Sequence, residues 1–237
     1  MAEIGIELLG GFRVVSDGRE IAIPASTRRL VAFLALRGRP AERTHLAGCL
    51  YLDKSEERAQ ANLRSVLWRL RRCEPQLVEA DAARVWVRAG VGIDVDRAIG
   101  MARTLIDDTT AVADPSVATV LFTSDLLPEW YDDFVIVERE RLRQLRLHAL
   151  EAAGRRLLRQ GRHAEALDAA LTAVAHEPVR ESAHRLTIEI HLDEGNPSEA
   201  VRQYGILERI LHEELGVAPS PGVQDLVGDL GRRVVVA

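Results

Sequence analysis

One stretch of the chain, residues 60–72, carries side chains of the kinds that contact nucleic acids. Its apolar residues recur at i, i+3, i+4 and i+7, which predicts an amphipathic helix with one buried face. These residues are Leu63, Val66, Leu67 and Leu70. The stretch contains no acidic residue, whereas a helix that only needs to be soluble usually mixes glutamate with its arginines. We therefore interpret its exposed face as a contact surface.

A helical wheel at about 100° per residue shows what that surface offers. The stripe opposite the buried face consists of Ala61, Ser65, Trp68 and Arg72, with Asn62 and Arg69 on one flank and Arg64 and Arg71 on the other. Small side chains allow close approach to a DNA groove, asparagine and arginine can bond to base edges, and outer arginines can reach phosphates. Arg64 and Arg71 lie nearest the core, which favours phosphate contacts. Two interpretations of Trp68 stay open: it packs against the hairpin or the first strands, or it contacts DNA.

The elements around this stretch follow a recognisable order. Alternating apolar residues predict short strands within residues 3–23, which form a small antiparallel sheet. Ser26 or Thr27 is expected to cap a first helix, and a second helix is expected to begin at Thr44. Residues 77–87 predict a two-stranded hairpin. Sheet, three helices and hairpin are typical of an α+β winged-helix domain, in which the third helix enters the major groove.

Two further contacts would follow from this arrangement. The N-terminus of the second helix, near Arg43 and Thr44, would face a phosphate. Arg84, expected near the tip of the hairpin, would touch the neighbouring backbone or minor groove. The alternative is an α+β domain whose arginine-rich helix is merely solvated.

Charge is distributed unevenly along the 237 residues. Residues 1–100 carry 16 basic and 13 acidic side chains, a net charge of +3, and the rest carries 15 and 23, a net charge of −8, which gives the total of −5. Any polyanionic partner is therefore expected at the front half. Cys49 and Cys73 lack the spacing of a metal site and are expected to be buried free thiols. The sequence shows neither a signal segment nor an apolar run of about 20 residues, which predicts a cytoplasmic protein.

The back half of the chain predicts helices almost throughout. Helices are expected at residues 95–106 and 133–160, with a looser stretch between them at residues 107–129. The sequence around Gly161 returns around Gly195, 34 residues later. This is the period of tetratricopeptide (TPR) helix pairs, whose stacks make concave protein-binding surfaces. Residues 94–237 are therefore expected to form an all-α, TPR-like domain.

Other residue groups could in principle support chemistry but favour simpler interpretations. His184 and His191 could share a helix face but lack a third metal ligand. Residues 138–141 alternate Glu and Arg, as a solvated ion-pair face does. Ser124 lacks the glycine-flanked turn of a nucleophile elbow. We expect no enzyme activity, no cofactor and no metal.

The order and spacing of several motifs resemble the Streptomyces antibiotic regulatory protein family. The motifs are RLVAFLAL (29–36), NLRSVLWRLRR (62–72), DVD (94–96), LPEW (127–130), ERERL (138–142), GRHAEA (161–166) and EELGVAP (213–219). The resemblance spans nearly everything from Ile6 to about Val227. It implies the short form of the family: a response-regulator-type winged helix at 1–93 followed by a helical bacterial transcriptional activation domain at 94–237.

The resemblance also implies a function and a set of contacts. Members are transcription activators of secondary metabolism, which bind direct repeats beside a promoter, head to tail, and engage RNA polymerase, with a sigma factor as a further expected partner. By motif match, Asn62, Arg64, Ser65, Trp68 and Arg69 fall where relatives contact bases or nearby phosphates, and Arg71 and Arg72 fall where phosphate contacts are common. Together with the wheel, this concentrates base reading on Asn62, Ser65, Trp68 and Arg69. The alternatives are a protein-interaction adaptor without DNA binding and a regulator that senses a ligand.

Overall fold

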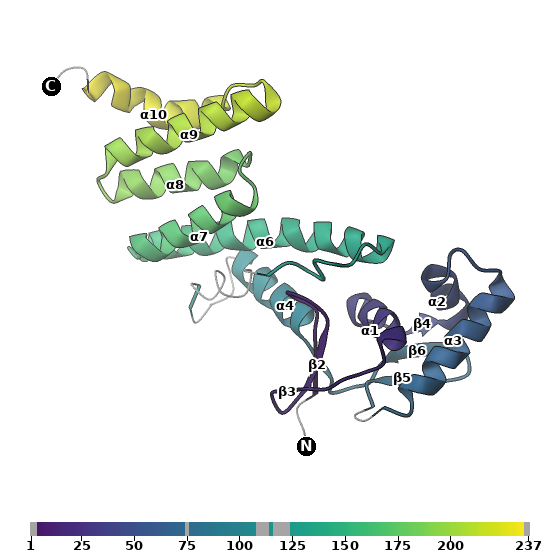
Figure 1. Ribbon diagram of the computed structural model, residues 1–237. Helices are drawn as coiled ribbons and strands as arrows, with labels where there is room; N and C mark the ends of the chain where they lie inside the picture. Colours follow the sequence, from purple (N-terminus) through teal and green to yellow (C-terminus); the bar gives the residue numbers. More distant parts are fainter. Residues whose placement is uncertain (1–3, 74–75, 108–113, 116–123, 235–237) are drawn as a thin grey trace. The chain divides into compact units, whose positions relative to one another are not determined.

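The computed structural model describes residues 4–73, 76–107, 114–115 and 124–234, with side chains described as far as residue 228 (Figure 1). The chain divides into two compact units. The N-terminal unit comprises Met1–Ala98 with Ser124–Leu142, and the C-terminal unit comprises Ile99–Thr123 with Arg143–Ala237. Part of the looser stretch expected at 107–129 lies outside the described residues. The expected boundary at residues 93–94 stays a prediction.

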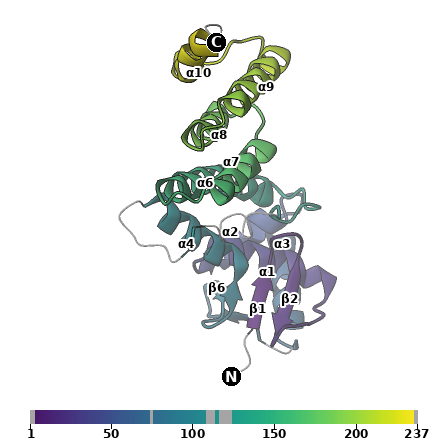
Figure 2. The same cartoon turned by 90° about the vertical axis from the view of Figure 1, so that its left-hand side faces the viewer.

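The first sheet of the N-terminal unit has the strand order β3-β2-β1-β7. Its strands are β1 (Ile4–Glu7), β2 (Arg13–Ser16), β3 (Arg19–Glu20) and β7 (Gly92–Ile93). The antiparallel pair β1–β2, seen side by side in Figure 2, sets Ile6 opposite Val14, and both side chains are buried. The antiparallel sheet expected within residues 3–23 is confirmed, and β7 adds a strand that pairs with β1 in parallel. Two residues are too few to give a strand signal in the sequence.

Three helices and a second sheet complete the winged-helix arrangement. The helices are α1 (Ala25–Arg37), α2 (Arg43–Leu50) and α3 (Glu56–Leu70). The second sheet has the order β4-β6-β5, from β4 (Ala41–Glu42), β6 (Arg84–Val87) and β5 (Val78–Ala80). The predicted fold class, a winged-helix region with an N-terminal sheet followed by a helical region, is confirmed.

The start of α1 differs from the prediction that Ser26 or Thr27 caps it. Pro24 is the N-cap, and the Thr27 side chain is buried with its hydroxyl donating to the Pro24 carbonyl at 2.7 Å. Ser26 is thereby placed inside the first turn of the helix, with its side chain exposed. The helix ends at Gly38, whose left-handed φ of 63° suits a residue without a Cβ.

A segment far along the sequence completes the core of the N-terminal unit. We call residues 125–134 the strap. Leu9 and Leu126 form a β-bridge, and the amide of Leu127 donates to the carbonyl of Leu8 at 2.9 Å. Leu126 and Leu127 are fully buried, and the Arg139 guanidinium donates to the carbonyls of Leu126 and Trp130, both at 2.9 Å. The strap therefore belongs to the same compact unit as the winged helix.

The C-terminal unit is helical in its described part. Its helices are α6 (Asp133–Arg159), which enters this unit at residue 143, α7 (His163–His176), α8 (Glu181–Asp193), α9 (Pro197–Leu215) and α10 (Pro221–Val234). α4 (Asp94–Ile106) also passes from one unit to the other at residue 98. From α7 to α10, each helix packs against the next (Figure 1). None of the described helices is long and apolar enough to span a membrane.

Two glycines mark the predicted repeat. Gly161 and Gly195 precede α7 and α9, and both have left-handed backbones, with φ of 70° and 81°. After the second glycine the sequence match drifts because α9 has 19 residues where α7 has 14. The five additional residues of α9 shift everything after it along the chain, so the 34-residue spacing is not kept beyond this helix.

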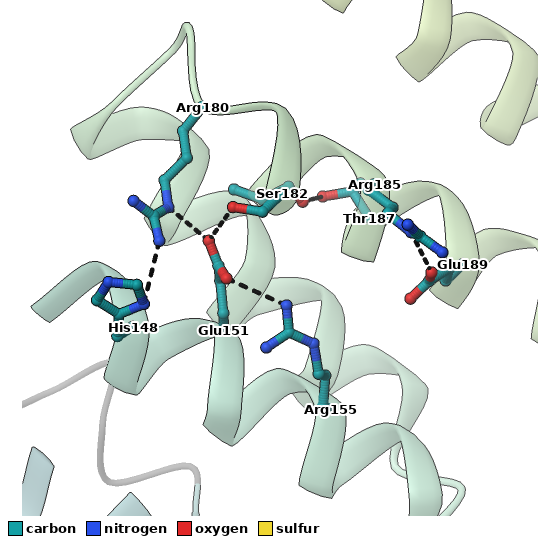
Figure 3. Close-up of polar contacts among 9 residues, drawn as sticks. His148, Glu151, Arg155, Arg180, Ser182, Arg185, Thr187 and Glu189 are labelled. Carbon is teal, nitrogen blue, oxygen red and sulfur yellow. Dashed lines mark hydrogen bonds and ion pairs between the residues drawn. The ribbon is translucent and has the colours of Figure 1, made fainter. Parts of the chain in front are cut away.

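A buried carboxylate fastens α6 to the start of α8 (Figure 3). The Glu151 side chain, 4% exposed, receives the Arg180 guanidinium at 2.5 Å and the Ser182 hydroxyl at 2.6 Å, while Arg155 pairs with its other oxygen at 3.1 Å. These partners lower the pKa of Glu151 against the opposing effect of burial. The Glu151 carboxylate thus bonds to three side chains of the protein itself, which indicates a structural role.

Candidate nucleic-acid interface

The exposed face of α3 gathers the side chains that the sequence assigns to DNA. Five residues expected at DNA lie on it with exposed side chains: Asn62, Arg64, Ser65, Trp68 and Arg69. The buried face consists of Ala59, Leu63, Val66, Leu67 and Leu70. The predicted amphipathic pattern of this helix is confirmed, because its apolar repeat packs inward and leaves the polar stripe outside.

The C-terminal end of α3 differs from the prediction. The helix begins at Glu56, so Glu56 and Glu57 occupy its first turn, where the helix dipole favours acidic side chains. It ends at Leu70, whereas the predicted stretch runs to residue 72. The amide of Arg72 donates to the carbonyl of Arg69 at 3.1 Å, an i→i−3 bond that tightens the chain into a closing turn. Arg71 and Arg72 therefore follow the helix, both exposed.

Trp68 remains on the surface. Its side chain is 60% exposed, and the Arg72 guanidinium lies 4.6 Å from the ring centroid. This is the geometry of a cation–π contact, which holds the arginine beside the ring. An aromatic plane and a guanidinium are thus presented together at the C-terminal end of α3.

Arg69 is tethered rather than free in solvent. Its Nη1 donates to the hydroxyl of Ser26 at 3.0 Å, which joins α3 to the first turn of α1. Sequence reasoning missed Ser26 as a partner, because it is 43 residues away and was expected to cap α1. A hydroxyl at this place holds one guanidinium nitrogen and leaves the others to reach outward.

The N-terminus of α2 is occupied by contacts to the hairpin. The Arg43 guanidinium donates to the carbonyl of Asp81 at 2.8 and 3.2 Å, and the Arg43 amide donates to Ala83 at 2.8 Å. Arg43 is therefore part of the joint between helix and hairpin. Thr44, in contrast, has an exposed side chain.

The hairpin formed by β5 and β6 has a short, well-fixed tip. The Asp81 carboxylate accepts the amides of Ala83 and Arg84 at 2.8 and 2.6 Å, and these bonds lower its pKa. Arg84 is the first residue of β6, one position past the tip, and its guanidinium lies 3.6 Å from the same carboxylate. Arg84 is exposed, but it shares its surface with this acidic side chain.

The histidines and cysteines weighed for metal binding have other surroundings in the described part of the chain. Among the described residues, no three His, Cys, Asp or Glu side chains are placed to hold a metal ion. His184 is buried, with Nε2 2.9 Å from the Pro178 carbonyl and Nδ1 2.8 Å from the Gln203 amide. Cys49 and Cys73 are free thiols, but both are half-buried rather than buried as expected.

Comparison with known proteins connects this arrangement to transcription. Residues 95–230, more than half of the chain, match the family model of the bacterial transcriptional activator domain. Regulatory protein AfsR of Streptomyces coelicolor is 29% identical, in an alignment that covers 92% of this chain and 23% of AfsR. AfsR of Streptomyces griseus is 26% identical, over 91% of this chain and 23% of that protein. The chain thus spans about a quarter of the length of these relatives.

A solved structure shares the fold. Mycobacterium tuberculosis EmbR, determined in complex with a low-affinity phosphopeptide, superposes with a TM-score of 0.76 at 18% identity. The match covers 98% of this chain and 66% of the EmbR chain.

Proposed function

The chain belongs to the bacterial transcriptional activator domain family, in agreement with its resemblance to the Streptomyces antibiotic regulatory proteins, and we propose that it is a DNA-binding transcription activator. α3 reads the major groove, and the β5–β6 hairpin contacts the neighbouring backbone or minor groove. The family consists of transcriptional regulators rather than enzymes.

The observation that carries this proposal is the exposed face of α3. This face carries the amide of Asn62, the small hydroxyl side chain of Ser65 and the aromatic ring of Trp68, and all three side chains are exposed. Arg69 lies beside them, held at one nitrogen by Ser26. Arginine and asparagine are the side chains that pair most specifically with base edges in the major groove. Arg64, Arg71 and Arg72 would neutralise phosphates.

The C-terminal unit would contact protein partners. We propose a TPR-like arrangement, which the left-handed glycines at 161 and 195 support because they recur with the period of such helix pairs. Stacked helix pairs offer protein-binding surfaces. The proposed partners are RNA polymerase, a sigma factor and a second copy bound head to tail on direct repeats. The proposed target is the promoter of a secondary-metabolite gene cluster, and the proposed location is the nucleoid.

Genome-wide mapping of bound sites, followed by titration of one mapped site, tests the proposal. We expect two copies of a short sequence in direct orientation, and an affinity that falls with salt by about 0.9 log units per log unit for each phosphate neutralised. An absence of DNA binding at low salt would contradict the proposal and favour an interaction adaptor.

A matched pair of variants locates the contact. Arg69→Ala is expected to weaken binding to the mapped site by about 1–3 kcal/mol and to relax the preference over random DNA. Arg202→Ala, which removes the same charge from a 70% exposed side chain on α9, is the control and should change neither. Equal losses on mapped and random DNA would make Arg69 a phosphate contact instead.

A further inference from the structure

The Arg29 guanidinium, on α1, joins three parts of the N-terminal unit. Its Nε lies 2.5 Å from Oδ1 of Asp132 in the strap, and its Nη1 donates to the carbonyl of Leu50. The Asp132 side chain is only 20% exposed, whereas Arg29 is 43% exposed. The carboxylate is therefore in ion-pair contact with a cation that also bonds to another helix.

Leu50 is the last residue of α2, and its carbonyl is one of those that a helix leaves without an internal partner. A cation at this end is also favoured by the helix dipole. Only five residues separate Leu50 from Glu56, the first residue of α3. The position of the end of α2 therefore limits where α3 can begin.

The first turn of α1 holds α3 a second time. Ser26, three residues before Arg29 and hence on the same side of the helix, accepts Arg69 at 3.0 Å. One short stretch of α1 thus contacts the C-terminal end of α2 and the C-terminal part of the exposed face of α3.

Two aromatic contacts, one on each side of Asp132, hold the strap against the rest of the N-terminal unit. Trp130 stacks on Phe12 with ring centroids 5.8 Å apart, and Phe134 meets Phe33 of α1 edge-on at 5.1 Å. These contacts place Asp132 against Arg29 without relying on the ion pair itself. Asp132 is therefore held where its charge can act on Arg29.

We propose that Asp132 is a positioning residue for DNA binding, which acts through Arg29 to set the end of α2 and the start of α3. This inference rests on the proposed function. It assigns to the strap a role in DNA binding although the strap itself carries no residue expected at DNA.

Asp132→Asn tests the inference against Asp133→Asn. Asparagine keeps the size of the side chain and is an equally good residue at a helix start, so the change removes chiefly the charge. Asp133 is the adjacent exposed carboxylate, and its replacement changes the net charge equally. Loss of an acidic charge alone should strengthen DNA binding slightly. A loss of affinity in Asp132→Asn would therefore have the opposite sign from the long-range electrostatic effect.

We expect Asp132→Asn to weaken binding to the mapped site about 3- to 10-fold, with a smaller effect on random DNA, and Asp133→Asn to leave affinity unchanged or slightly higher. On an Arg29→Ala background, Asp132→Asn should have no further effect, because such a cycle isolates the coupling between the two residues. Equal affinities of the two single variants, or full additivity with Arg29→Ala, would overturn the inference.

A second measurement does not depend on DNA. The amides of Tyr51 and Lys54 donate to Ala47 and Tyr51 at 3.0 and 3.1 Å at the end of α2. Their hydrogen exchange should accelerate in Asp132→Asn and not in Asp133→Asn. Unchanged exchange would also overturn the inference. If the wild type and Asp133→Asn bind no DNA while exchange behaves as expected, the proposed function fails and the positioning of α2 by Asp132 stands.

Discussion

At the scale of single residues, the candidate interface has one partner that the sequence does not reveal, Ser26. Asn62, Ser65, Trp68 and Arg69 are exposed together, as the wheel predicts. Two of them have partners: Ser26 bonds to Arg69, and Arg72 lies over the ring of Trp68. A side chain held in place before binding loses less entropy on binding than a free one.

Removal of the tether at Ser26 should therefore loosen recognition. Ser26→Ala leaves Arg69 in place but frees its guanidinium, so we expect weaker discrimination between the mapped site and random DNA with nearly unchanged binding to random DNA. Competition titrations with both DNAs measure this ratio. Ser198→Ala, at an exposed position of α9, is the control. An unchanged ratio in Ser26→Ala would show that the tether does not order Arg69.

We expect His184 to make the stability of the C-terminal unit dependent on pH. Burial lowers the pKa of this side chain below its ordinary 6.5, although the bond to the Pro178 carbonyl and the charge of Glu181 oppose the shift. The folded protein thus binds its proton less readily than the unfolded chain does. The stability contributed by neutral His184 is complete above pH 6.5 and is lost as the pH falls through the folded-state pKa.

Urea unfolding at pH 7.5 and pH 5 should show this loss in the C-terminal unit. His184→Gln removes the titration and should flatten the dependence, whereas His45→Gln, at an exposed position of α2, should retain it. A His184→Gln variant with the wild-type pH dependence would exclude this histidine as the cause. Should that variant fail to fold, the pKa of His184 followed by NMR in the wild type answers the same question, and a value at or above 6.5 would contradict the expectation.

At the scale of elements, the close approach of α7 and α8 to α6 depends on Gly154 in α6. A Cβ at this position would lie 2.8 Å from Cδ2 of Leu186 and 3.3 Å from the carbonyl of Ala166. Gly154→Ala is therefore expected to lower the free energy of unfolding by about 1–3 kcal/mol through overpacking. Gly205→Ala, on α9 with no atom within 4 Å of the added carbon, should stabilise by up to about 1 kcal/mol. Thermal melts of both variants check the opposite signs.

The sequence predicts elements well where a periodic pattern is long. The apolar repeat of Leu63, Val66, Leu67 and Leu70 locates the buried face of α3 correctly. Its C-terminal end was placed too far along the chain because the tightening turn after Leu70 depends on backbone bonds alone. Strands such as β4 and β7, of two residues each, exist only through pairing with distant strands and leave no local signal.

At the scale of the whole molecule, the compact units do not follow the sequence order. More than 25 residues separate the strap from Ala98, yet the strap belongs to the N-terminal unit. Sequence patterns could not predict this, because Leu126 and Leu127 show no periodicity and their burial arises from pairing with Leu8 and Leu9. Leu8 and Leu9 are also joined to the start of α4, because the Asp94 carboxylate accepts their amides at about 2.9 Å.

A fragment that ends at Ile93 should therefore be less stable than one that ends at Leu142. The shorter fragment lacks the Asp94 carboxylate and the buried side chains of Leu126, Leu127 and Val135. Burial of each of these three apolar side chains contributes about 1.5–3 kcal/mol. We expect the fragment 1–93 to unfold at a lower temperature, as measured by circular dichroism. Equal melting temperatures would show that the winged helix folds independently of the strap.

The exposed indole beside Arg72 also has an optical consequence. Of the three tryptophans, Trp68 is 60% exposed, whereas Trp86 donates to Glu79 at 3.2 Å and Trp130 stacks on Phe12. A collisional quencher such as iodide should therefore extinguish the emission of Trp68 first. DNA that covers α3 would shield the ring from iodide, so the unlabelled protein carries its own fluorescent reporter of groove binding.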